Sequence, residues 1–113
     1  MPIPIEITHR DVELSPEIED HIRERAEKLG HFFDRIVGAH ITVEGPGGHH
    51  KTGGQYRIKV QLAVPGNDVV INHKSSEDLA VAVRDAFDAA KRRLEDHVRR
   101  MRGEVKSHQA PSS

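Results

Sequence analysis

The fold is decided by residues 15–30, which read SPEIEDHIRERAEKLG. Ser15 is a residue type that caps the free amides of a helix start, and Pro16 is favoured at the first helical position. The apolar residues then recur at helical spacing: Ile18, Ile22, Ala26 and Leu29. Gly30 is a natural stop signal. The pattern therefore predicts an amphipathic helix over residues 16–29.

Strand patterns lie on both sides of this helix. Ile3, Ile5 and Ile7 alternate with more polar neighbours, which predicts a strand over residues 3–9. Three further alternating runs follow the helix: residues 37–43, 56–62 and 69–71. The glycine-rich residues 45–54 separate the first two of these runs and predict a long hairpin loop. Residues 65–68, Pro-Gly-Asn-Asp, predict a tighter turn.

A second and longer helix is predicted over residues 77–102. Ser75 and Ser76, followed by the acidic residues Glu77 and Asp78, predict a capped helix start. A single apolar stripe follows over six or seven turns: Leu79, Val83, Phe87, Ala90, Leu94, Val98 and Met101. We expect this helix to be the longest element of the fold.

The element order β-α-β-β-β-α predicts an α+β fold, a two-layer sandwich of a four-stranded sheet with two helices on one face. The first helix connects the first two strands as a crossover, so we expect these strands to be parallel, with hairpins joining the others. Arg57, Lys59 and Gln61 alternate with the apolar residues of their strand, and we expect that sheet face to meet water. Phe32 and Phe33 are expected to pack at the end of the core.

Length and composition limit the possible classes of protein. The chain has 113 residues and no cysteine, which suits one soluble domain and excludes thiolate chemistry. We expect a single domain over residues 1–106 and a disordered tail over residues 107–113. No apolar run approaches the ~20 residues of a membrane-spanning helix. We therefore expect no membrane association and a cytoplasmic location.

Sequence signals for a metal or cofactor are weak. The chain has nine histidines, including the adjacent pair His49 and His50 in the glycine-rich loop, but no ligand-like carboxylate or HxxxH pair accompanies them. The loop also lacks the spacing of a P-loop, because Lys51 and Thr52 precede a glycine and lead to a strand. The carboxylates fall mainly at helix starts and on charged helix faces. We expect no metal, no cofactor, no small-molecule substrate and no enzymatic activity; a metal-responsive loop at His49 is the least favoured alternative.

Charge is distributed unevenly along the chain. The net charge is −1, but residues 1–50 carry five basic and ten acidic side chains, whereas residues 51–113 carry twelve basic and eight acidic ones. Such asymmetry suggests a polyanionic partner, although a solvated surface that balances its own charge is common. The basic residues are densest toward the end of the second helix: Lys91, Arg92, Arg93, Arg99, Arg100, Arg102 and Lys106. They exceed what stabilisation of a helix end requires, and they predict a groove that binds phosphates by charge and shape.

Two segments resemble the family of ribosome hibernation promoting factors and ribosome-associated translation inhibitors. One is Phe33-Asp34-Arg35-Ile36 after a Lys-Leu helix end, and the other is the acidic-capped second helix that leads into Arg92, Arg93, Leu94 and His97. The element order matches as well, so the resemblance covers about residues 3–104. The family fold is similar to that of double-stranded RNA-binding domains. The chain departs from the family pattern at Ala80, Ala89 and Glu95-Asp96, which thins the basic face.

The resemblance implies a non-catalytic protein that binds the small ribosomal subunit, through ribosomal RNA, in the channel for messenger and transfer RNA. It would thereby inhibit translation and protect idle ribosomes under stress or in stationary phase. The length implies a short family form, without the additional domain of long members, and we expect a monomer off the ribosome. The RNA-binding residues carried over by position are Arg25, Lys28, Arg35, Arg92, Arg93, His97, Arg100 and Arg102. Lys91 and Arg99 join them on the exposed helix flank.

One alternative from a different class stays open. The near-neutral net charge also fits a protein-interaction or regulatory domain that uses the open sheet face and does not bind RNA.

Overall fold

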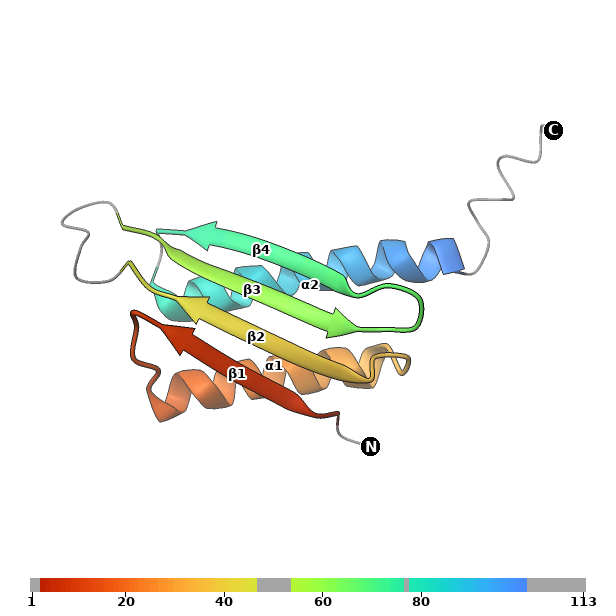
Figure 1. The fold of residues 1–113 in the computed structure, drawn as a ribbon, viewed down its shortest axis with the longest axis horizontal. Coiled ribbons are helices and arrows are strands. Elements are labelled where there is room, and N and C mark those ends of the chain that lie inside the picture. Colours follow the sequence, from red (N-terminus) through yellow and green to blue (C-terminus); the bar gives the residue numbers. More distant parts are fainter. Residues whose placement is uncertain (1–2, 47–53, 77, 102–113) are drawn as a thin grey trace.

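The computed structural model describes residues 3–46, 54–76 and 78–101, in which a four-stranded sheet carries two helices on one face (Figure 1). The elements are β1 (Ile5–Arg10), α1 (Pro16–Phe32), β2 (Gly38–Glu44), β3 (Tyr56–Ala63), β4 (Val69–Ser75) and α2 (Leu79–Met101). This is the two-layer α+β sandwich that the sequence predicts. Neither helix contains a stretch long and apolar enough to cross a membrane.

The sheet has the strand order β1-β2-β3-β4. β1 pairs in parallel with β2, with Ile5 opposite Ala39, which confirms that α1 is a crossover connection. The β2–β3 and β3–β4 pairs are antiparallel. Gly66 in the β3–β4 turn has a positive φ of 96°, a conformation that L side chains rarely adopt, in agreement with the predicted tight turn.

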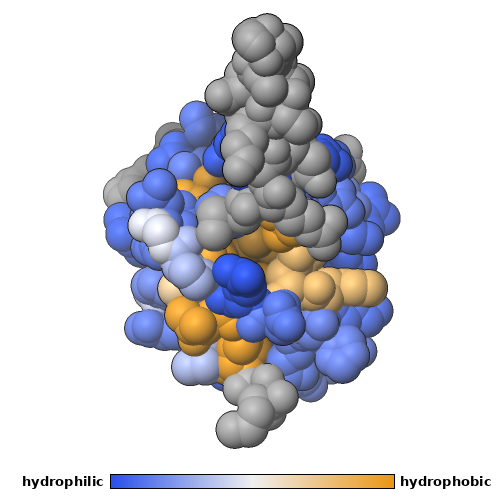
Figure 2. Space-filling view, turned by 90° about the vertical axis from the view of Figure 1, so that its right-hand side faces the viewer, coloured by the Kyte–Doolittle hydropathy of each residue, from blue (hydrophilic) through white to orange (hydrophobic). Residues whose placement is uncertain are grey.

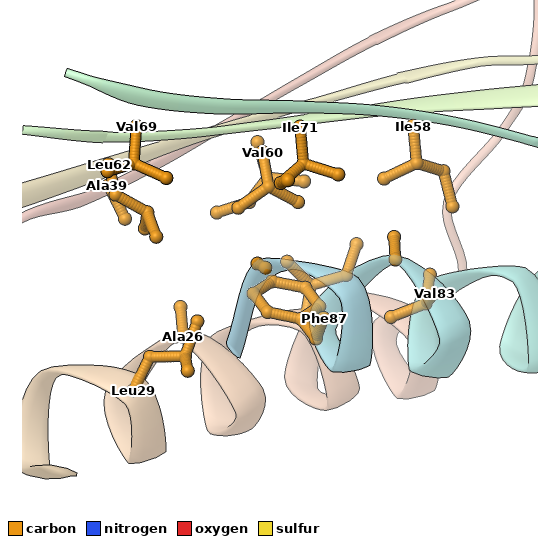
Figure 3. Close-up of a cluster of buried hydrophobic side chains, with 14 of the residues drawn as sticks. Ala26, Leu29, Ala39, Ile58, Val60, Leu62, Val69, Ile71, Val83 and Phe87 are labelled. Carbon is orange, nitrogen blue, oxygen red and sulfur yellow. The ribbon is translucent and has the colours of Figure 1, made fainter. Parts of the chain in front are cut away.

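The core fills the space between the sheet and the two helices (Figure 3). Ile58, Val60 and Leu62 of β3 are fully buried, and side chains from α2, such as Val83 and Phe87, face them. α1 contributes the side chains expected from its apolar spacing: Ile22, Ala26 and Leu29. The opposite faces of the strands carry the polar residues, so the sheet is apolar toward the helices and polar toward solvent.

Helix α1 does not end at Gly30, as the stop signal predicted, but continues to Phe32. A side chain at position 30 would place its Cβ 3.2 Å from Cδ1 of Ile3, which packs over this turn of the helix. Gly30 therefore allows a close approach between the helix and the segment before β1. The helix closes where the N–H of Phe33 donates a hydrogen bond of 2.8 Å to the carbonyl of Leu29.

The start of α2 also differs from the prediction. Oδ1 of Asp78 accepts a hydrogen bond from the N–H of Val81 at 3.0 Å, so Asp78 is the residue that caps this helix. Ser75 is instead the buried last residue of β4, which extends four residues beyond the predicted end at Ile71. The cap of α1 is as predicted, because Oγ of Ser15 accepts a hydrogen bond from the N–H of Ile18 at 3.2 Å.

Candidate nucleic-acid interface

The two helices run side by side in the same direction, so their C-terminal ends lie together at one end of the molecule (Figure 1). The α1–β2 connection and the β3–β4 turn meet at the same end, where they and α2 line an open pocket of about 320 Å³. Figure 2 views this end and shows apolar surface surrounded by hydrophilic residues. We call it the helix-end face; it consists of residues 28–37 and 64–65 and the described part of α2 from Lys91 onward.

Most of the basic residues predicted from the sequence are exposed at this face. They are Lys28, Arg35, Lys91, Arg92, Arg93, Arg99 and Arg100. His97 is half-buried and lines the pocket together with Arg35. Arg25 is also half-buried and lies earlier on α1. Arg102 and Lys106 lie outside the described residues.

Two of the predicted residues are engaged with carboxylates. Arg25 of α1 forms an ion pair of 3.7 Å with Asp88 of α2, which links the two helices. Arg99 forms an ion pair with Asp96, three residues earlier on α2. Within the described part of the helix-end face, six exposed cations have no carboxylate partner: Lys28, Arg35, Lys91, Arg92, Arg93 and Arg100. Their charge is available to an anionic ligand.

The cations of α2 point in more than one direction. Residues seven apart on a helix are separated by almost two full turns and therefore share a face. Arg92 shares a face with Arg99, and Arg93 shares a different face with Arg100. Lys91 lies on the side toward α1, because its Nζ is 5.3 Å from the ring centroid of Phe32. The helix therefore presents its cations on more than one side, as a broad basic surface.

Phe32 is the residue of this face that the sequence analysis placed wrongly. It was expected in the core, but it is 65% exposed, whereas the neighbouring Phe33 is half-buried and packs against the core. Phe33 lies four residues after Leu29 and therefore continues the apolar stripe of α1, whereas Phe32 lies to one side of that stripe. That spacing was the signal that Phe32 would be the exposed member of the pair.

The open sheet face satisfies many of its polar groups internally. Glu44 of β2 lies between Arg10 of β1 and Arg57 of β3, at 3.4 and 3.6 Å. Oγ1 of Thr8 and Nε2 of His40 form a hydrogen bond of 2.9 Å. This face combines mixed charges with internal pairing, and it is less basic than the helix-end face.

No group of three or more potential metal ligands occurs among the residues that the structure describes. The histidine pair His49 and His50 lies outside these residues, and the metal hypothesis for that loop stays a prediction.

Comparison with known proteins shows which family the sequence matches. Residues 5–102 match the family described as Sigma 54 modulation protein / S30EA ribosomal protein. A search of curated proteins finds no match.

Two solved structures have a similar fold. One is a ribosomal subunit interface protein from Coxiella burnetii, with a TM-score of 0.70 and 16% sequence identity, covering 84% of this chain and 97% of that chain. The other is the N-terminal domain of Protein Y from Thermus thermophilus, with a TM-score of 0.66 and 21% identity, covering 86% of this chain and 99% of that chain.

Proposed function

Because the chain belongs to the family of sigma 54 modulation proteins and S30EA ribosomal proteins, we propose that it is a ribosome hibernation factor that binds the small subunit through its helix-end face. It occupies the channel for messenger and transfer RNA and so inhibits translation under stress or in stationary phase. The protein acts by occupancy, without catalysis.

The observation that carries this proposal is the set of exposed cations without carboxylate partners at the helix-end face. Arg92, Arg93 and Arg100 of α2 and Lys28 and Arg35 at the end of α1 are available to phosphates. Contacts of this kind fix orientation on RNA and give salt-dependent affinity without reading the base sequence. Ribosomal RNA, folded into a fixed shape, is a partner for which such a surface suffices.

Co-sedimentation with isolated ribosomal subunits over a salt series tests the proposal. We expect saturable binding of the wild-type chain to the small subunit, weakening with salt, and a loss of at least about tenfold in the variant Arg92→Glu/Arg100→Glu, which replaces attraction by repulsion at two phosphate contacts. Competition with messenger RNA for the same subunits tests the channel assignment. Absence of wild-type binding at low salt would overturn the proposal.

A matched control is Lys59→Glu/Lys74→Glu, which changes the net charge by the same amount on the open sheet face. Lys59 and Lys74 are exposed and have no carboxylate partner among the described residues. We expect this variant to bind subunits nearly as tightly as the wild type. The reverse result, with the sheet variant impaired and the helix variant normal, would favour the alternative interaction through the open sheet face.

A further inference from the structure

Phe32 is exposed at a position where the fold does not need an aromatic side chain. It is the last residue of α1, and the next residue, Phe33, is the phenylalanine that packs against the core. Phe32 is 65% exposed, and the ammonium group of Lys91 lies 5.3 Å from the centroid of its ring. An exposed aromatic ring beside a cation is a common means of binding single-stranded nucleic acid, because bases stack on the ring while cations hold phosphates.

Phe32 also lines the pocket of the helix-end face. The other walls are largely apolar, from Ile36, Val64, Leu94 and Val98, and the polar groups come from three residues, Asp34, Arg35 and His97. Its volume, about 320 Å³, lies at the small end of the range of ligand pockets, ~300–1,000 Å³. It is therefore suited to one ring system and too small for a duplex.

The chemistry of the lining matches a nucleotide. A base has apolar faces, which suit the aliphatic walls and the Phe32 ring, and polar edges, which can bond to Asp34 and His97. Arg35 is exposed and has no carboxylate partner in the described chain, so it can hold the phosphate attached to that base. An apolar protein side chain would fill the walls but would leave these polar groups without partners.

We infer that the pocket beside Phe32 takes one unpaired nucleotide of the bound RNA, with its base stacked on the Phe32 ring and its phosphate at Arg35. The inference rests on the proposed function and deepens it, because it specifies that the RNA contacted here includes an unstacked base as well as backbone.

Fluorescence of a new tryptophan tests the stacking directly, since the chain contains no tryptophan. The variant Phe32→Trp keeps an aromatic platform and places the reporter at the pocket. Val37→Trp is the matched control, because Val37 is 63% exposed and is absent from the pocket lining. The probes are a short single-stranded RNA of mixed sequence, a fully paired RNA duplex, and heparin, a polyanion without bases.

We expect the single-stranded RNA to quench the fluorescence of Phe32→Trp strongly, and the duplex and heparin to quench it much less, with only small changes in Val37→Trp. In co-sedimentation with small subunits, Phe32→Ala should bind at least about fivefold more weakly than the wild type, the loss expected for one base stack. Val37→Ala should bind normally.

The results separate this inference from the proposed function. Wild-type binding to subunits without quenching of Phe32→Trp by RNA would overturn the nucleotide site, even if Phe32→Ala were impaired, since a protein side chain would then occupy the pocket. Normal subunit binding by Phe32→Ala would also overturn it. Quenching by single-stranded RNA without wild-type binding to subunits would instead overturn the ribosomal function and leave the stacking site standing.

Discussion

At the scale of single residues, the glycine that begins β2, Gly38, and the glycine that directly follows β2, Gly45, have different surroundings. A Cβ at Gly45 would clash with the carbonyl oxygen of Asp11 and would lie 2.7 Å from Cβ of Val12, so the β1–α1 connection passes directly against this glycine. At Gly38, the nearest atom to such a Cβ is the carbonyl oxygen of Pro4, at an ordinary 3.8 Å. Gly45 is thus fixed by packing against backbone, whereas Gly38 is not.

We therefore expect Gly45→Ala to lower the free energy of unfolding by about 1–3 kcal/mol, because backbone atoms must move to admit the methyl group. Gly38→Ala should change it by less than about 0.5 kcal/mol. Urea unfolding of both variants measures the difference. Equal stabilities would show that the connection after β1 is free to shift.

At the scale of elements, alternation and helical spacing predicted all six elements, and their order along the chain predicted the parallel β1–β2 pair. The ends of elements were less predictable, because they depend on contacts between distant parts of the chain. Gly30 does not stop α1, which continues to Phe32, and the glycine instead lets Ile3 pack closely on that turn. Most of the predicted cations that the structure describes at the helix ends are exposed, but Phe32 was missed because the prediction treated Phe32 and Phe33 alike and did not extend the apolar stripe of α1 to Phe33.

The capping of α2 gives a prediction at this scale. Asp78→Ala should lower the free energy of unfolding by about 1 kcal/mol, because the N–H of Val81 loses its acceptor. Ser76→Ala is the control, since Ser76 is exposed and lies before the cap; we expect its unfolding free energy to stay within about 0.5 kcal/mol of the wild-type value. Thermal or urea unfolding distinguishes the two, and an equal loss in both variants would contradict the assignment of the cap.

At the scale of the whole molecule, net charge describes this protein poorly. The chain is close to neutral, with a net charge of −1, yet exposed cations without carboxylate partners collect at the helix-end face. Other cations are neutralised by carboxylates of the same chain, as Arg25 is by Asp88. A polyanion that reaches this face therefore meets a local positive field that the overall charge conceals.

The salt dependence of subunit binding should report this local field. Arg92→Ala/Arg100→Ala should reduce the slope of log affinity against log salt by about 1–2, one unit or less for each phosphate contact removed. Phe32→Ala should weaken binding without changing the slope, because base stacking releases few counterions. Titrations at several salt concentrations measure both quantities, and an unchanged slope in the double variant would place these arginines away from phosphate.

The parallel pairing of β1 with β2 also affects the order in which the molecule assembles. The β3–β4 hairpin joins residues that are close in sequence, whereas β1 reaches β2 only after α1 has crossed the sheet. Closing that longer loop costs more conformational entropy, so β1 should be the last strand to dock and the first to detach. Its amide hydrogens should exchange with solvent faster than those of β3, which would make the N-terminal edge the part of the fold that opens at least cost.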